Sequence, residues 1–311
     1  HRISVGNTAG RLTMSQASIT DLPGFANALK LDCTTADTSI AANEDLVIQH
    51  RLEGQDLQVL QKGTSSAQPV TVSFYMKTNK AFTFMCELDD TDNNRVNTQQ
   101  FTTTTSWTRH SLTFTGDTTG TLNDDANLSM RLNFWLHAGS NFTGGTYSAN
   151  TWQSRQTSDN MRAVGIGSFF DNTANEIHLT GIQLELGEQA TPFEHRSVHD
   201  ELARCQRYYW QVAGASQIVG QGFYYSTSEF DCIVNLPQTM RAAPTFTPSN
   251  NSGDFQVTNI SDSFDTWTAQ QFFDGSRVNV YVTSGVSGTK GDSGYVRHMN
   301  STSKIQFDAE L

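Results

Sequence analysis

Apolar and polar residues alternate along much of the chain, and a period of two is typical of strands that bury one face. Residues 70–76 read V-T-V-S-F-Y-M, and residues 128–136 read L-S-M-R-L-N-F-W-L. Further alternating runs lie at 82–88, 107–114 and 177–186. Turn-forming residues separate the runs, at 89–94, 116–117, 139–141 and 171–172. Many short strands separated by turns predict an all-β fold, built as a sandwich or a barrel.

One helix is predicted, over 198–209. Ser197 is followed by Asp200 and Glu201, a pattern that resembles a capping box ahead of an apolar stripe. Short alternating stretches resume after this helix and continue to the C-terminus. We therefore predict a first β domain at 1–190, a connector with a short helix at 191–210, and a smaller β-sandwich domain at 211–311.

Three motifs around this connector resemble a known family. They read Q-L-E-L-G at 183–187, A-T-P-F-E at 190–194 and C-Q-R-Y-Y at 205–209. In this order they resemble a segment of bacteriophage tail fibres and related virion appendage proteins. Further stretches at 51–57, 69–74, 116–120 and 236–245 are also similar to that family. The resemblance covers roughly 10–247, and residues 248–311 are unmatched.

The resemblance implies a fold and a role. It implies that residues 1–190 form a jelly-roll β-sandwich like that of carbohydrate-binding modules, with a concave face and, in some relatives, a structural calcium ion. It implies a non-enzymatic structural component of a phage virion that displays a surface for a glycan on the host cell. Other virion proteins would be its partners, and such fibres are commonly homotrimers. Assembly would take place in the host bacterial cytoplasm. Because the chain opens at His1 in the middle of a domain, we expect it to be part of a longer product.

Composition narrows the possible partners. The chain carries 20 Lys and Arg against 31 Asp and Glu, a formal net charge of −11. An acidic chain has no general electrostatic attraction for nucleic acid, so we expect no nucleic-acid partner. No apolar run approaches the roughly 18 residues of a membrane span, so we expect no membrane insertion.

Two motifs suggest chemistry only weakly. Residues 90–94 begin like a calcium-binding loop, but Arg95 and Phe101 stand where Gly and Glu are required. A polar hairpin turn is therefore expected there. A different calcium site, made of a strand-end carboxylate and backbone carbonyls, stays open. Residues 291–294 read G-D-S-G, the string around a serine-protease nucleophile, but no matching histidine motif accompanies it. We expect a loop and no catalytic residue.

Aromatic residues are the candidate ligand-binding groups. Sugar rings present apolar C–H faces that stack on aromatic side chains. The candidates in the part that resembles a carbohydrate-binding module are Trp107, Trp135, Phe142, Tyr147 and Trp152. The last three fall in or next to a loop-like run, and loops on a rigid sandwich are where binding concentrates. Packing in the core or between subunits uses the same residue types and stays open for each of them.

Other functions remain as alternatives. The chain could be a carbohydrate-binding module of a secreted polysaccharide-degrading enzyme, or a capsid fibre or decoration protein. A depolymerase tailspike would need paired carboxylates in a cleft, and no sequence pattern marks such a pair.

Overall fold

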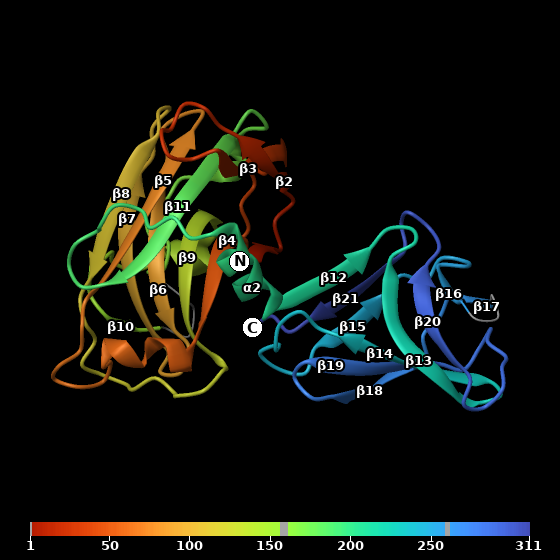
Figure 1. Ribbon diagram of the computed structural model, residues 1–311. Coiled ribbons are helices and arrows are strands. Elements are labelled where there is room, and N and C mark those ends of the chain that lie inside the picture. Colours follow the sequence, from red (N-terminus) through yellow and green to blue (C-terminus); the bar gives the residue numbers. More distant parts are fainter. Residues whose placement is uncertain (1, 156–160, 259–261) are drawn as a thin grey trace. The chain divides into compact units, whose positions relative to one another are not determined.

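The computed structural model describes residues 2–155, 161–258 and 262–311 (Figure 1). The chain divides into two compact units, 1–194 and 195–311. The helix that was predicted as part of a connector therefore belongs to the second unit. No helix among the described residues is long and apolar enough to cross a membrane.

The N-terminal unit is a sandwich of two antiparallel sheets, as Figure 1 shows. The six-stranded sheet has the order β1 (Arg2–Gly6), β4 (Asp45–Glu53), β9 (Leu128–Ala138), β6 (Thr83–Asp90), β7 (Arg95–Thr102) and β10 (Gln153–Ser154). The five-stranded sheet has the order β2 (Arg11–Ser18), β3 (Asn27–Thr35), β11 (Glu176–Leu186), β5 (Val70–Thr78) and β8 (Thr108–Phe114). Short helical turns join the strands at η1 (Gly54–Leu60), α1 (Ser140–Thr143) and η2 (Phe169–Asp171). The predicted all-β jelly-roll sandwich is confirmed.

The core of this unit lies between the two sheets and follows the alternation in the sequence. On β9 the side chains of Met130, Leu132, Phe134 and Leu136 enter the core. Phe134 packs edge-on against Phe74 from the opposite sheet, with ring centroids 4.8 Å apart. Each fully buried side chain of this size contributes roughly 1.5–3 kcal/mol. The residues between them on β9 point to the other face of the six-stranded sheet, which is called the outer face below.

His50 on β4 points toward this core, and its burial lowers the pKa of the imidazole from 6.5 to about 4. Between pH 6.5 and pH 4 the unfolded chain therefore binds a proton that the folded chain does not. We expect the free energy of unfolding to fall as pH drops through this window, by up to about 3 kcal/mol from this residue. Denaturant unfolding of the wild type and of His50→Gln from pH 7.5 to pH 4 measures the effect. If the free energy of unfolding depends on pH identically in both proteins, His50 makes no such contribution.

The A-T-P-F-E segment is held against the five-stranded sheet. Gly187 ends β11 with φ +107°, a conformation that glycine adopts without strain. Beyond it, the Glu185 carboxylate accepts a hydrogen bond from the Thr191 hydroxyl at 2.5 Å. Phe193 packs against Phe25, with ring centroids 5.2 Å apart. The motif that carries the family resemblance thus serves to anchor the chain as it leaves the sandwich.

The C-terminal unit is a second sandwich of unequal sheets. Its smaller sheet has the order β12 (Tyr209–Ala213), β21 (Lys304–Asp308) and β15 (Thr245–Pro248). The larger sheet has the order β17 (Asp262–Phe264), β16 (Phe255–Val257), β20 (Ser293–His298), β13 (Ile218–Ser226), β14 (Glu229–Asn235), β19 (Arg277–Val282) and β18 (Ala269–Phe273). Phe307 of the small sheet shares one core with Phe230 and Val280 of the large sheet. The predicted second, smaller β-sandwich is present.

Helix α2 (Val198–Gln206) begins at the predicted cap. The Ser197 hydroxyl accepts a hydrogen bond from the Asp200 backbone N–H at 3.1 Å and donates one to the Asp200 carboxylate at 2.6 Å. The expected apolar stripe is not buried on the helix, since Leu202 and Cys205 are both exposed.

Because the cap satisfies a free N–H at the start of α2, Ser197→Ala should destabilise the helix by about 1 kcal/mol. The change in helicity of a peptide covering 195–208 would measure it. A Ser197→Asp peptide, which keeps an oxygen acceptor, should retain the helicity. Equal helicity in all three peptides would contradict the capping role.

Candidate functional site

A buried ammonium group lies where the five- and six-stranded sheets are joined by loops. Lys62 follows η1, and its side chain is only 3% exposed. Its Nζ is 2.5 Å from Asp90 Oδ2 at the end of β6 and 3.0 Å from Asp117 Oδ2. It also donates hydrogen bonds to the carbonyl oxygens of Thr119 and Gly120, at 2.9 and 3.0 Å. Two carboxylates and two carbonyls thus surround one cation.

These four oxygen atoms, called the cage below, can be compared with the calcium site that the sequence left open. The cage is of the expected composition, a strand-end carboxylate with backbone carbonyls, but the Lys62 ammonium occupies its centre. Arg95 adds a two-pronged contact to Asp117, at 2.6 and 3.0 Å. Burial alone would raise the pKa of Asp117, but the hydrogen bonds from Arg95 and Lys62 outweigh it and keep the pKa below its ordinary value. Residues 91–94 form the expected polar turn between β6 and β7.

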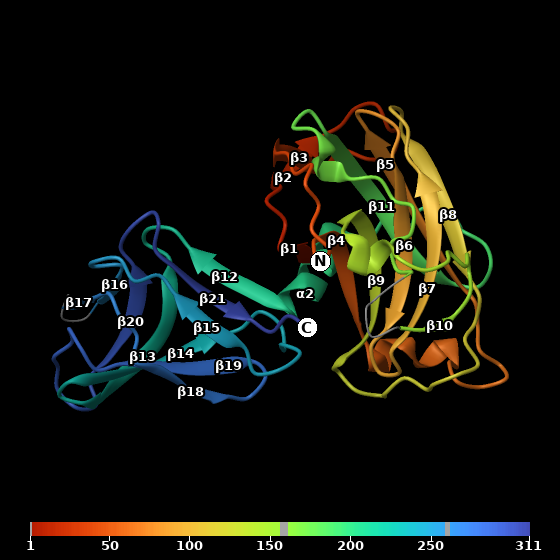
Figure 2. The same cartoon turned by 180° about the vertical axis from the view of Figure 1, so that it is seen from behind.

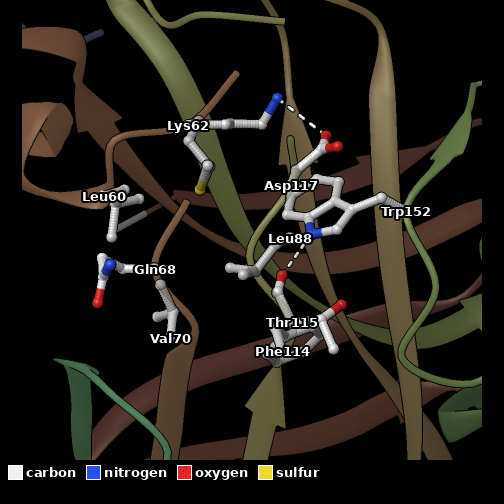
Figure 3. A pocket seen from close by; sticks show the side chains of 10 residues that line it. Leu60, Lys62, Gln68, Val70, Leu88, Phe114, Thr115, Asp117 and Trp152 are labelled. Carbon is white, nitrogen blue, oxygen red and sulfur yellow. Dashed lines mark hydrogen bonds and ion pairs between the residues drawn. The ribbon is translucent and has the colours of Figure 1, made fainter. Parts of the chain in front are cut away.

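Trp152 lies beside Lys62 and Asp117 of this cage, as Figure 3 shows. Its indole N–H donates to the Thr115 carbonyl at 2.6 Å, and Lys62 Nζ lies 5.2 Å from the ring centroid. The indole therefore packs beside a buried cation. Stacking of a sugar ring on Trp152 stays a prediction. The contacts with Thr115 and Lys62 show that the indole packs within the fold.

Three other predicted aromatics pack on the outer face of the six-stranded sheet. Trp135 is 3% exposed, and Phe142 stacks against it with ring centroids 5.1 Å apart. Tyr147 lies in the same cluster, and its hydroxyl accepts a hydrogen bond from the Gln100 backbone N–H at 2.8 Å. Ligand binding by Trp135 stays a prediction, and the structure shows its ring buried. Phe142, Tyr147, Ala163 and Ile166 pack with the Trp135 ring.

Arg162 connects the stretch 161–167 to the six-stranded sheet by contacts with two carboxylates of β6. Its guanidinium lies over the Trp135 ring, 4.9 Å from the ring centroid. It donates hydrogen bonds to Glu87 Oε2 at 2.7 Å and to Glu87 Oε1 at 2.5 Å. A further contact joins it to Asp89 Oδ2 at 3.0 Å. Glu87 and Asp89 are both 0% exposed, so burial of these charges depends on the arginine. The outer face around Trp135 is therefore covered by Arg162 and by the residues that pack with the indole.

Trp107 is the fifth predicted residue and lies apart from the other four. It stands just before β8, where its indole N–H donates to Asp21 Oδ1 at 2.9 Å. Lys77 Nζ lies 5.9 Å from its ring centroid. Its ring is partly exposed, so Trp107 stays a candidate for stacking on a ligand.

The C-terminal unit carries an aromatic surface that sequence reasoning missed. It lies on the face of the large sheet that points away from the core, over β20, β13, β14 and β19, whose ribbons can be followed in Figure 2. Strand pairing places its residues in two parallel rows. These residues, called the platform below, are Ser293, Phe223, Asp231 and Tyr281 in the first row and Tyr295, Gln221, Ile233 and Asn279 in the second.

Large apolar side chains of the platform are open to solvent. Phe223 is 43% exposed, Ile233 is 42% exposed and Tyr295 is 39% exposed. Tyr281 is half-buried at the end of the first row. Contiguous exposed aromatic residues on one rigid sheet indicate an interaction surface rather than scattered surface residues.

Polar acceptors lie between these rings. Asp231 Oδ1 and Asn279 Oδ1 are shielded from solvent and have no hydrogen-bond partner among the described residues. Burial raises the pKa of Asp231 above its ordinary value, although the Asn279 amide partly opposes the rise. Buried acceptors without donors are costly, so a ligand that donates hydrogen bonds would satisfy them.

A signal for this surface was present in the sequence. On β13 and β20 the outward positions carry Phe223 and Tyr295, whereas outward positions in the first sandwich are mostly Thr, Ser or charged residues. Alternation alone does not say which of the two faces meets a second sheet. The core-facing Tyr224 and the outward Phe223 and Tyr225 are therefore equivalent candidates until the fold is known.

The structure places the residues that the sequence suggested for catalytic and metal chemistry. In the described parts of the chain, no three His, Cys, Asp or Glu residues are grouped so that they could hold a metal ion. The G-D-S-G run forms a turn that leads into β20, where Ser293 belongs to the platform. His298, on the same strand, is 0% exposed in the core.

Comparison with known proteins was made on sequence and on structure. No protein-family profile matches the chain, and no curated protein matches it. A solved family 4 carbohydrate-binding module aligns at 12% identity over 58% of this chain and 79% of its own, with a TM-score of 0.30. A family 11 carbohydrate-binding module from Clostridium thermocellum, in complex with a β-1,3-1,4-mixed-linked tetrasaccharide, aligns at 13% identity over 60% of this chain and 88% of its own, with a TM-score of 0.30. The xylan-binding domain CBM22-1 of Paenibacillus barcinonensis Xyn10C aligns at 11% identity over 60% of this chain and 87% of its own, with a TM-score of 0.29. Similarity at this level carries no conclusion about what this chain binds.

Proposed function

We propose that this chain is a non-enzymatic structural component of a phage virion, a tail fibre or another appendage, that binds a glycan on the host surface. The virion role rests on the motifs around 183–209, which resemble those of phage appendage proteins. The binding role rests on one observation: the platform combines exposed aromatic rings with unpaired buried acceptors.

The chemistry of the platform suits a sugar better than a flat apolar partner. An exclusively apolar partner would leave Asp231 Oδ1 and Asn279 Oδ1 without donors. Sugar hydroxyls can donate hydrogen bonds to these oxygens while the C–H faces of the sugar rings lie on the aromatic rings of Phe223 and Tyr295. The platform lies on four paired strands of one sheet, so little conformational entropy is lost on binding.

We propose that the chain works as a homotrimer with other virion proteins, at the surface of a particle assembled in the host cytoplasm. Contacts with single sugars are weak. Several copies held on one particle can raise avidity by roughly 10²–10⁴ without any new contact.

Binding of the full chain to a glycan array tests the proposal. We expect wild type to bind at least one glycan, and Phe223→Ala/Tyr295→Ala to lose that binding. Both residues face solvent, so the melting temperature of the double variant should stay close to that of wild type. Trp107→Ala is the matched control, since it removes a partly exposed ring from the other unit.

Three outcomes would count against parts of the proposal. Absence of binding to any glycan would overturn the binding role. Loss of binding in Trp107→Ala with retention in the double variant would move the site to the N-terminal unit. Release of reducing ends from host polysaccharide would contradict a non-enzymatic role.

A further inference from the structure

The two aromatic rings of the first row are separated by one intervening strand. Phe223 on β13 pairs with Asp231 on β14, and Asp231 pairs with Tyr281 on β19. Neighbouring strands are about 4.8 Å apart, so the two aromatic positions are about 10 Å apart across the sheet. Asp231 lies between them, with its Oδ1 shielded and unpaired.

This spacing corresponds to alternate sugars in an extended chain. In a β-1,4-linked glycan, successive rings turn over, so rings i and i+2 present the same face in the same direction. Their separation is close to that of the Phe223 and Tyr281 positions. The ring between them would have its hydroxyls over Asp231.

We propose that the platform binds an extended, neutral, β-linked glycan that runs across the strands, along the row Phe223–Asp231–Tyr281. Phe223 and Tyr281 each stack under one sugar ring, and Asp231 Oδ1 accepts a hydrogen bond from a hydroxyl of the sugar between them. Asn279 Oδ1, in the second row, accepts from a hydroxyl at the flank. This proposal deepens the proposed glycan-binding function and depends on it.

Charge favours a neutral chain over an anionic one. Asp231 is the only charged side chain of the first row, among residues that all lie in the described part of the chain, and Arg277 and Arg297 lie beyond the second row. An acidic sugar over the first row would bring its carboxylate close to that carboxylate. Repulsion in a partly desolvated site would weaken binding of uronates and sialylated chains.

Titration calorimetry with oligosaccharides of defined length tests the inference on the full chain. The probes are cello-, xylo- and chito-oligosaccharides of two to six sugars, with malto-oligosaccharides as the coiled, α-linked control. We expect at least one β-1,4-linked series to bind, with a rise in affinity of about tenfold or more between two and three sugars. Dimers cannot reach both rings, which is the cause of the step. The malto-oligosaccharides should not bind.

Variants separate the row from the rest of the surface. Phe223→Ala and Tyr281→Ala should each weaken trisaccharide binding by about tenfold or more, because each removes one stacking ring. Tyr225→Ala is the control, since Tyr225 lies on the same strand and is 55% exposed but stands outside both rows. It should change affinity less than twofold. Asp231→Leu should weaken binding, and Asp231→Asn, which keeps an acceptor oxygen, should restore most of it.

Failure of this inference is distinguishable from failure of the proposed function. If a glycan binds but affinity does not depend on chain length, or Tyr281→Ala binds as wild type does, the row is not the binding track and the proposed glycan-binding function stands. Preference for α-linked or acidic chains would overturn the inference in the same way. If no glycan on the array or in these series binds, both proposals fall.

Discussion

Replacing Lys62 by Met should lower the melting temperature of the N-terminal unit by roughly 10 °C or more. The methylene stem of the side chain would still fill its space, but the ammonium between Asp90 and Asp117 would be lost. The two buried carboxylates and the two carbonyls would then face one another, with the Arg95 guanidinium at Asp117 as the cation that remains. Removing one partner of a buried ion pair costs about 3–5 kcal/mol, and here one cation serves two carboxylates.

Lys80→Met is the matched control for this experiment. Lys80 also pairs with a carboxylate, Asp171 at 2.8 Å, but its side chain is 43% exposed. An exposed pair contributes about 1 kcal/mol or less, so the control should melt close to wild type. Scanning calorimetry of the three proteins at pH 7 measures both effects. Similar melting temperatures for Lys62→Met and Lys80→Met would show that the cage contributes no more than a surface pair.

Arg162→Met should be the second strongly destabilising change, with an expected loss of about 3 kcal/mol. The substitution removes three contacts to Glu87 and Asp89 while both carboxylates stay buried. Asp89 would keep contacts with Arg131 and Arg155, and Glu87 would keep one with Asn133. The stretch 161–167 would lose the contacts that Arg162 makes with the sheet, so limited proteolysis should cut there faster than in wild type.

Arg155→Met is the control for Arg162→Met, since Arg155 also contacts Asp89. Its side chain is 22% exposed, and its contacts with Asp89 are longer, at 3.2 and 3.4 Å. We expect a loss of about 1 kcal/mol. Chemical denaturation and a proteolysis time course on each variant measure stability and release of the stretch 161–167 separately. Equal losses for the two variants would contradict a special role for Arg162.

Alternation in the sequence predicted the strands well, because half-buried strands leave a regular pattern. The run at 128–136 corresponds to β9, and the run at 177–186 corresponds to β11. The same alternation does not indicate whether other residues of the protein also cover the outer face of β9. Trp135 and Phe134 are neighbours on one strand, yet both are buried, because residues far along the chain fill the outer face.

The candidate sites were harder to predict than the fold. Lys62 is a single charged residue in a loop, and its partners come from positions 90, 117, 119 and 120, so no local spacing marks the cage. The platform is likewise assembled across four strands whose neighbours are known only once the pairing is known. Local motifs such as the Ser197 cap were accessible, since both partners lie within one turn of chain.

The Lys62 cage has a consequence for how this unit responds to its surroundings. A metal ion held in a protein stabilises it by mass action, and the benefit falls as the free ion is diluted or chelated. The Lys62 ammonium is tethered to the chain, so the cation cannot leave the folded unit when the solution changes. The stability that it provides is therefore independent of the supply of free ions in the solution.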